Sequence, residues 1–138
     1  MSRNRVVVGV VIAVAAIVGA TVWALADSSG HDLTLDGTSW TLTDLDGSPV
    51  TGTAPTLAFT GYEVSGTGGC NTFNGGYETE ANSIRFGSIG STMMACEDPA
   101  LPQETIYFAA LDGATSATVD GDTLTITGHA GTLTFAAD

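Results

Sequence analysis

The chain has 138 residues, of which 15 are acidic and three are arginine, with no lysine; this length holds one domain, or one domain plus a targeting segment. All fifteen acids follow Ala26, where Arg85 is the one cation, so residues 27–138 carry a formal charge of −14. Such a surface repels phosphate backbones, which excludes nucleic-acid binding. Hydrophobic residues make up 43% of the chain and charged residues 13%, which excludes the composition of a disordered protein.

The N-terminal residues are typical of an export segment. Residues 1–5 carry two arginines, and residues 6–26 form an apolar run of 21 residues without charge. As a helix this run would rise about 31 Å, enough to cross a bilayer core of ~30 Å with the arginines on the cytoplasmic side. The length of the run and Trp23 favour an uncleaved anchor. The small residues of the triplet that ends at Ala26 favour a signal peptide cleaved at that point.

Either outcome places the folded part of the chain outside the cytoplasm. The protein is then attached to the membrane through residues 6–26, or it is secreted after cleavage behind Ala26. Residues 27–32 are expected to form a short polar linker, and residues 33–138 the folded domain.

The folded part is patterned as short strands separated by turns. Apolar residues recur at every second position, as in strands with one buried face. The expected strands are Thr38–Leu45, Thr56–Thr60, Tyr62–Gly66, Gly76–Glu80, Ser83–Phe86, Thr115–Val119, Thr123–Thr127 and Thr132–Ala136. The residues expected to face inward are Trp40, Leu42, Leu57, Phe59, Val64, Ile84, Phe86, Leu124, Ile126, Leu133 and Phe135.

One amphipathic helix is expected near residues 99–112. Asp98 resembles an N-cap before a proline in the first turn, and Gly113 can close the C-terminal end. The face at a spacing of three to four residues is formed by Leu101, Thr105, Phe108 and Leu111. The predicted fold class is α+β, an antiparallel curved sheet or open barrel of about eight short strands packed with this helix, preceded by the N-terminal apolar helix.

The most unusual stretch runs from Gly66 to Cys96, beginning GTGGCNTFNGGY and ending STMMAC. The density of glycine in its glycine-rich loop argues against regular strand or helix there and predicts a tight turn with positive φ angles, in which Asn71 and Asn74 bond to nearby main chain. The stretch holds both cysteines of the chain. An even count in an exported domain favours a disulfide between Cys70 and Cys96, with two buried free thiols as the alternative.

Few residues suggest catalytic, metal or cofactor chemistry. The glycine loop lacks the lysine of a nucleotide-binding loop, and neither His31 nor His129 has a metal-type spacing to a cysteine, so no metal or cofactor is expected. Carboxylates that could form a pair for glycoside hydrolysis are Glu63, Glu78, Glu80, Glu97 and Glu104. No spacing selects two of them, and Glu104 is assigned to the dipole at the N-terminal end of the helix.

Together these motifs resemble the META domain family of HslJ-like envelope proteins. The resemblance rests on Trp40 with Leu42, on G-x-GGCN-x-F from Gly66 to Phe73 and on T-x-MAC from Thr92 to Cys96, and it covers about residues 33–138. It implies an antiparallel sheet curved around a helix, no catalytic activity, and a role in heat or stress response. The motif positions are Trp40, Gly68, Gly69, Asn71, Phe73, Thr92, Met94 and Glu104.

The sequence therefore predicts a non-catalytic protein of the cell envelope, anchored in the membrane or secreted. It would bind an envelope protein or a small apolar ligand in a stress response. The alternative is a hydrolase of cell-surface glycans that uses a carboxylate pair. An apolar cavity between the sheet and residues 99–112 would favour the first hypothesis, and two acids facing each other ~5–9 Å apart in a concave pocket would favour the second.

Overall fold

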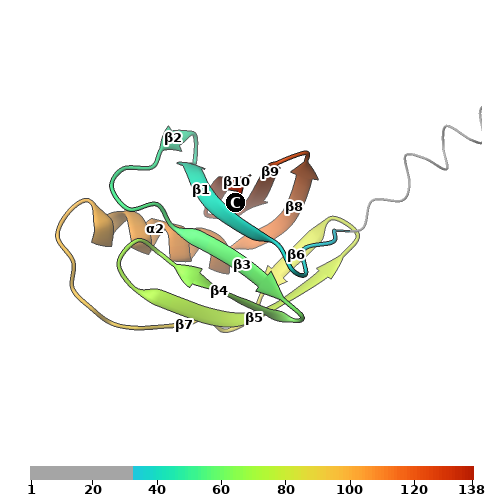
Figure 1. The fold of residues 1–138 in the computed structure, drawn as a ribbon, viewed down its shortest axis with the longest axis horizontal. Helices are drawn as coiled ribbons and strands as arrows, with labels where there is room; N and C mark the ends of the chain where they lie inside the picture. The colour runs from blue at the N-terminus through green and yellow to red at the C-terminus, as the bar shows by residue number, and fades with distance from the viewer. Residues whose placement is uncertain (1–32) are drawn as a thin grey trace, which may run out of the picture. The chain divides into compact units, whose positions relative to one another are not determined.

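A computed structural model describes residues 33–138, and Figure 1 shows their arrangement. The expected apolar helix at 6–26, its cleavage site and the linker lie outside the described residues. Within residues 33–138 no helix is long and apolar enough to span a membrane. The elements are β1 (Ser39–Leu45), β2 (Ser48–Pro49), β3 (Thr56–Thr60), β4 (Glu63–Thr67), β5 (Thr72–Glu80), β6 (Ser83–Phe86), β7 (Gly90–Ser91), α2 (Ala100–Asp112), β8 (Ala114–Asp120), β9 (Thr123–Gly128) and β10 (Gly131–Ala137).

The strands form one antiparallel sheet that closes into a barrel. Its order is β1, β3, β4, β5, β6, β8, β9 and β10, and β10 returns to pair with β1. The short strands β2 and β7 pair with β1 and β5 outside this path. Strands β6 and β8 have the shortest pairing around the barrel, with a single register pair, Ser83 with Ser116. The predicted α+β fold is confirmed, and the β1–β10 pairing closes the barrel.

Strand β5 corrects the expectation that the glycine-rich stretch contains no regular strand before Gly76. It begins at Thr72 and includes both Gly75 and Gly76. A Cβ atom added to Gly75 would lie 2.9 Å from the carbonyl oxygen of Ser88 and 3.2 Å from Cγ1 of Ile89. Glycine is therefore required here because the segment after β6 crosses close to the strand, and the absence of a side chain serves packing rather than a turn.

The barrel interior is a continuous apolar core. All eleven residues predicted to face inward are buried, at 5% relative exposure or less. Aromatic rings pack in two separate groups: Phe59 meets Tyr77 edge to face at 4.8 Å between ring centroids, and Tyr107 meets Phe135 at 6.2 Å. Burying a large apolar side chain contributes about 1.5–3 kcal/mol, so this core supplies most of the driving force for folding.

Helix α2 packs against β6, β9 and β10, and of the predicted face only Leu111 is fully buried. Leu101 and Thr105 are exposed and Phe108 is half-buried. The buried residues are Gln103, Glu104, Tyr107, Ala110 and Leu111. Asp98 does not cap the helix, whose N-cap is Pro99 without a side-chain hydrogen bond, whereas Gly113 closes the C-terminal end as expected through its N–H bond to the carbonyl of Ala109.

The interior on the barrel side of α2 is filled by side chains. Tyr107 is fully buried, contacts the rings of Phe73 and Phe135, and donates its hydroxyl to the carbonyl oxygen of Thr56 at 3.1 Å. Leu111 is also fully buried. Two pockets on the described residues contain no residue of α2, so neither is the apolar cavity against the helix that would favour an internal ligand.

Tyr107 makes the stability of the domain dependent on alkaline pH. Burial raises the pKa of its hydroxyl well above the ordinary value of about 10. Below that pH the group is protonated in both states; above it the unfolded chain loses the proton first, so stability falls as pH rises. We expect Tyr107→Phe to reduce the fall in Tm between about pH 10 and pH 11.5, measured by circular dichroism. An unchanged slope would contradict this assignment; a smaller residual slope is expected from Tyr77, whose pKa burial also raises.

Candidate functional site

The glycine loop presents backbone N–H donors, and these donors bind the Glu104 carboxylate of helix α2. The N–H groups of Cys70 and Asn71 donate to Oε1 of Glu104 at 3.2 and 2.5 Å. The Asn71 side-chain amide donates to Oε2 at 2.7 Å. Glu104 is only 3% exposed, and no cation pairs with it among residues 33–138, where the one ion pair is Arg85 with Glu78. Backbone and amide donors therefore satisfy its charge.

Two glycines of the loop permit this approach. A Cβ atom on Gly68 would lie 2.5 Å from Cγ of Glu104 and 2.6 Å from its Oε1, so a larger residue would displace the carboxylate. Gly69 has φ of +104°, a conformation that residues with a side chain rarely adopt. The predicted turn with positive φ is present. Glu104 does not lie in the first turn of α2 as a dipole partner, because its side chain points into the loop instead.

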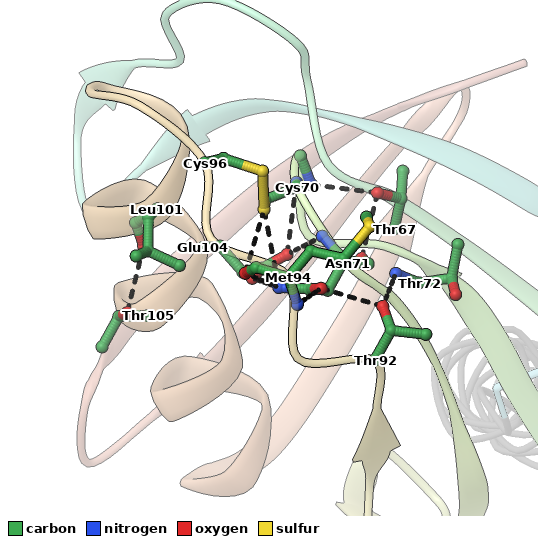
Figure 2. Close-up of a disulfide and its surroundings, with 11 residues drawn as sticks. Thr67, Cys70, Asn71, Thr72, Thr92, Met94, Cys96, Leu101, Glu104 and Thr105 are labelled. Carbon is green, nitrogen blue, oxygen red and sulfur yellow. Dashed lines mark hydrogen bonds between the residues drawn. A yellow bond between two sulfur atoms is a disulfide. The ribbon is translucent and has the colours of Figure 1, made fainter.

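Asn71 joins the loop to the segment before the helix. Its Oδ1 accepts the backbone N–H of Met94 at 2.6 Å and the hydroxyl of Thr92 at 2.9 Å, and its Nδ2 donates to the carbonyl of Met94 at 3.2 Å. The main-chain partner of Asn71 is thus distant in sequence rather than nearby. Figure 2 shows these side chains converging with Glu104 beside the disulfide.

The disulfide completes this cluster. Cys70 and Cys96 are bonded, with a Cα–Cα distance of 6.0 Å and a sequence separation of 26 residues, as the sequence predicts. It fixes the end of the exposed segment 90–95 beside the loop. The predicted motif positions thus divide into two groups: Gly68, Gly69, Asn71, Thr92, Met94 and Glu104 meet around the disulfide, while Trp40 and Phe73 are buried in the core.

A second site, which sequence reasoning missed, is an open groove of about 940 Å³ at one end of the barrel. It is lined by the turn before β1, the β3–β4 turn, the ends of β5 and β6, and the start of β8. Its lining includes the aromatic and charged side chains of Asp36, Tyr62, Tyr77, Glu78, Glu80 and Arg85. No sequence motif unites them, because they come from four separate segments that only the closed barrel brings together.

The predicted carboxylates are distributed between these places. Glu104 is saturated by its three donors, and Glu63 and Glu97 do not line the groove. Glu78 and Glu80 do, but they are two residues apart on β5 and so point the same way rather than toward each other. Glu78 also pairs with Arg85 at 3.2 Å, with both side chains nearly four-fifths exposed. Residues 33–138 contain no cluster of three metal-binding side chains.

The sequence pattern of one family matches this arrangement. The family pattern of the META domain covers residues 31–138, most of the chain. The chain belongs to the META domain family. In this META domain, the glycine loop and the T-x-MAC segment are distant in sequence, and the disulfide and the hydrogen bonds of Asn71 join them.

Two solved structures are similar to this META domain. The NMR structure of a protein from Burkholderia xenovorans is 28% identical, with a TM-score of 0.62, and the match covers 75% of this chain and 83% of that one. A second structure, described as the NMR structure of a protein, is 25% identical with a TM-score of 0.63, covering 74% and 90%. No curated protein shows significant similarity to the chain.

Proposed function

We propose that this chain is an exported, non-catalytic binding protein of the cell envelope. It is held at the membrane through residues 6–26, or released by cleavage after Ala26, and its META domain binds its partner outside the cytoplasm. The observation that carries this proposal is the disulfide between Cys70 and Cys96, since such bonds persist in oxidising compartments and are rare in the cytosol. The basic and apolar segments at the N-terminus support it independently.

The filled interior of the barrel disfavours a ligand bound inside it. Tyr107 and Leu111 occupy the space against α2, and each is fully buried. A small apolar ligand inside the barrel would have to displace them at a cost of several kcal/mol. Binding at the surface requires no such rearrangement, and the open groove offers a place for it. We therefore favour a surface partner over an internal apolar ligand. We also propose a role in envelope stress, which the resemblance to the family supports.

The alternative, a glycan hydrolase, has weaker support. Glycosidases place two carboxyl groups on either side of the bond that is cleaved. In the groove, Glu78 and Glu80 lie side by side on one strand, and Arg85 neutralises the first of them. This arrangement suits the binding of a ligand rather than acid–base chemistry at a glycosidic bond.

The location is tested with the full-length chain carrying a C-terminal tag in a bacterial host. We expect the tag to be digested by protease added to spheroplasts, and the cysteines of the denatured chain to resist thiol labelling until a reductant is added. Intact mass distinguishes a chain that starts at Met1 from one that starts at Asp27. The Cys70→Ser/Cys96→Ser double variant supplies the labelling background. A protected tag with thiols that label without reductant would contradict export.

A further inference from the structure

Tyr77 presents an unused polar group to the groove. Its ring is packed against Phe59 and the residue is 8% exposed, yet its hydroxyl has no hydrogen-bond partner among residues 33–138. That hydroxyl is not sealed from solvent, because no sealed side-chain oxygen in the described residues lacks a partner. A tyrosine with a buried ring usually satisfies its hydroxyl within the protein. Here the hydroxyl opens into the groove, where a ligand can reach it.

Asp36 lies close enough to act on the same group. Its Oδ1 accepts the backbone N–H of Gly61 at 2.7 Å, which fixes the carboxylate at the β3–β4 turn and leaves Oδ2 without a partner in the described residues. Burial, then the Asp36 carboxylate and then the Tyr62 hydroxyl raise the pKa of Tyr77. Asp36, Tyr62 and Tyr77 all line the groove, which places one carboxylate and two hydroxyls along the same surface.

The remaining lining has the chemistry of a cation site. Tyr62, in the turn between β3 and β4, lines the groove and is 87% exposed, so the face of its ring is accessible to a ligand. Glu78 and Glu80 also line the groove, but from the face of β5 opposite to Tyr77, and Glu78 is offset by Arg85. Aromatic faces attract cations, and clefts lined by one sign of charge concentrate ions of the opposite sign. With −14 on residues 27–138, anionic ligands are disfavoured everywhere on this domain.

We propose that this groove binds an organic cation, an ammonium or guanidinium group of the kind carried by polyamines and by lysine or arginine side chains. The cation lies on the Tyr62 ring and is held by Oδ2 of Asp36 and the oxygen of the Tyr77 hydroxyl. The size of the groove admits a ligand or peptide segment, within the range of ~300–1,000 Å³ common for binding sites. The inference rests on the proposed binding role, but not on the location of the protein.

The test uses the full-length chain in a non-ionic detergent and isothermal titration calorimetry. Spermidine and a blocked lysine tripeptide are the two probes, and they distinguish a free polyamine from a basic protein segment as the source of the cation. Titration in about 100 mM salt, where the Debye length is ~10 Å, suppresses attraction by the general surface charge. We expect at least one of the probes to bind with one-to-one stoichiometry.

Three variants locate the binding. Asp36→Asn keeps an oxygen for the Gly61 N–H and removes one charge, and we expect about tenfold weaker binding, equivalent to ~1.4 kcal/mol. Tyr77→Phe removes a hydroxyl that makes no internal hydrogen bond, and Tyr62→Ala removes an exposed ring; each should weaken binding several-fold without lowering Tm. The matched control Asp122→Asn makes the same charge change in the exposed β8–β9 turn and should have little effect.

Three results would overturn the inference: no binding of either probe, equal weakening by Asp36→Asn and Asp122→Asn, or binding of a neutral oligosaccharide in place of the cations. None of these would alter the outcome of protease accessibility and thiol labelling, so a failure here is distinguishable from a failure of the proposed export. A loss of binding accompanied by a loss of folding in Asp36→Asn is resolved by Tyr77→Phe and Tyr62→Ala.

Discussion

Replacing Glu104 by alanine is expected to lower the free energy of unfolding by about 3–5 kcal/mol, the largest effect of any single substitution outside the apolar core. The side chain is buried and accepts three hydrogen bonds from Cys70 and Asn71. Its removal takes the acceptor from three N–H donors, two of them in buried bonds, at about 1–3 kcal/mol for each buried group left unsatisfied. Urea denaturation measures the change.

Two further variants separate charge from packing. Glu104→Gln retains the volume and one acceptor oxygen but places an amide group opposite the Asn71 amide, so we expect roughly half the loss of the alanine variant. Asp112→Asn removes a charge from an exposed position of the same helix and should change stability by no more than about 0.5 kcal/mol. If Glu104→Ala were as mild as Asp112→Asn, the carboxylate would not be held by the loop as described.

Reduction of the disulfide is the second large effect. Removing the bond between Cys70 and Cys96 should lower the free energy of unfolding by about 3–4 kcal/mol, because a closed loop of this length restricts the unfolded chain. The reduced domain should stay folded at 25 °C, since Asn71 still binds the main chain of Met94. Thermal unfolding with and without a phosphine reductant measures the difference.

The control for reduction is the Cys70→Ser/Cys96→Ser double variant. It should unfold at the temperature of the reduced wild type and should not respond to the reductant. Identical melting of the oxidised and reduced wild type would show that the bond does not constrain the unfolded chain. Near-ultraviolet circular dichroism reports whether the core around Phe73 and Tyr107 remains packed after reduction.

The barrel could be predicted from the sequence because its signal is local. Alternation of apolar and polar residues identifies which side of a strand is buried, and it does so correctly for residues as far apart as Trp40 and Phe135. The buried face of α2 could not be predicted in this way. Gln103 and Glu104 are polar, so hydropathy assigns them to solvent and assigns Leu101 to the core, whereas the structure does the reverse.

These polar residues are buried because they form hydrogen bonds with groups that are distant in the chain. Gln103 accepts the N–H of Thr51 at 2.9 Å and donates to its carbonyl at 3.1 Å, and Glu104 binds the loop more than thirty residues before it. Neither of these hydrogen-bond partners, Thr51 or the glycine loop, produces a periodic pattern in the sequence. The groove could not be predicted from the sequence for the same reason, because only the closed barrel brings Asp36, Tyr62 and Tyr77 to one surface.

The glycine loop has two of its backbone donors occupied by the Glu104 carboxylate. Its N–H groups are arranged to receive an anion, and a free phosphate would have to compete with Glu104 for them. Tethering gives an intramolecular ligand an effective concentration on the order of millimolar or more, which a rigid helix raises further. Helix α2 therefore keeps these loop donors occupied, and the carboxylate joins two segments that are more than thirty residues apart in the chain.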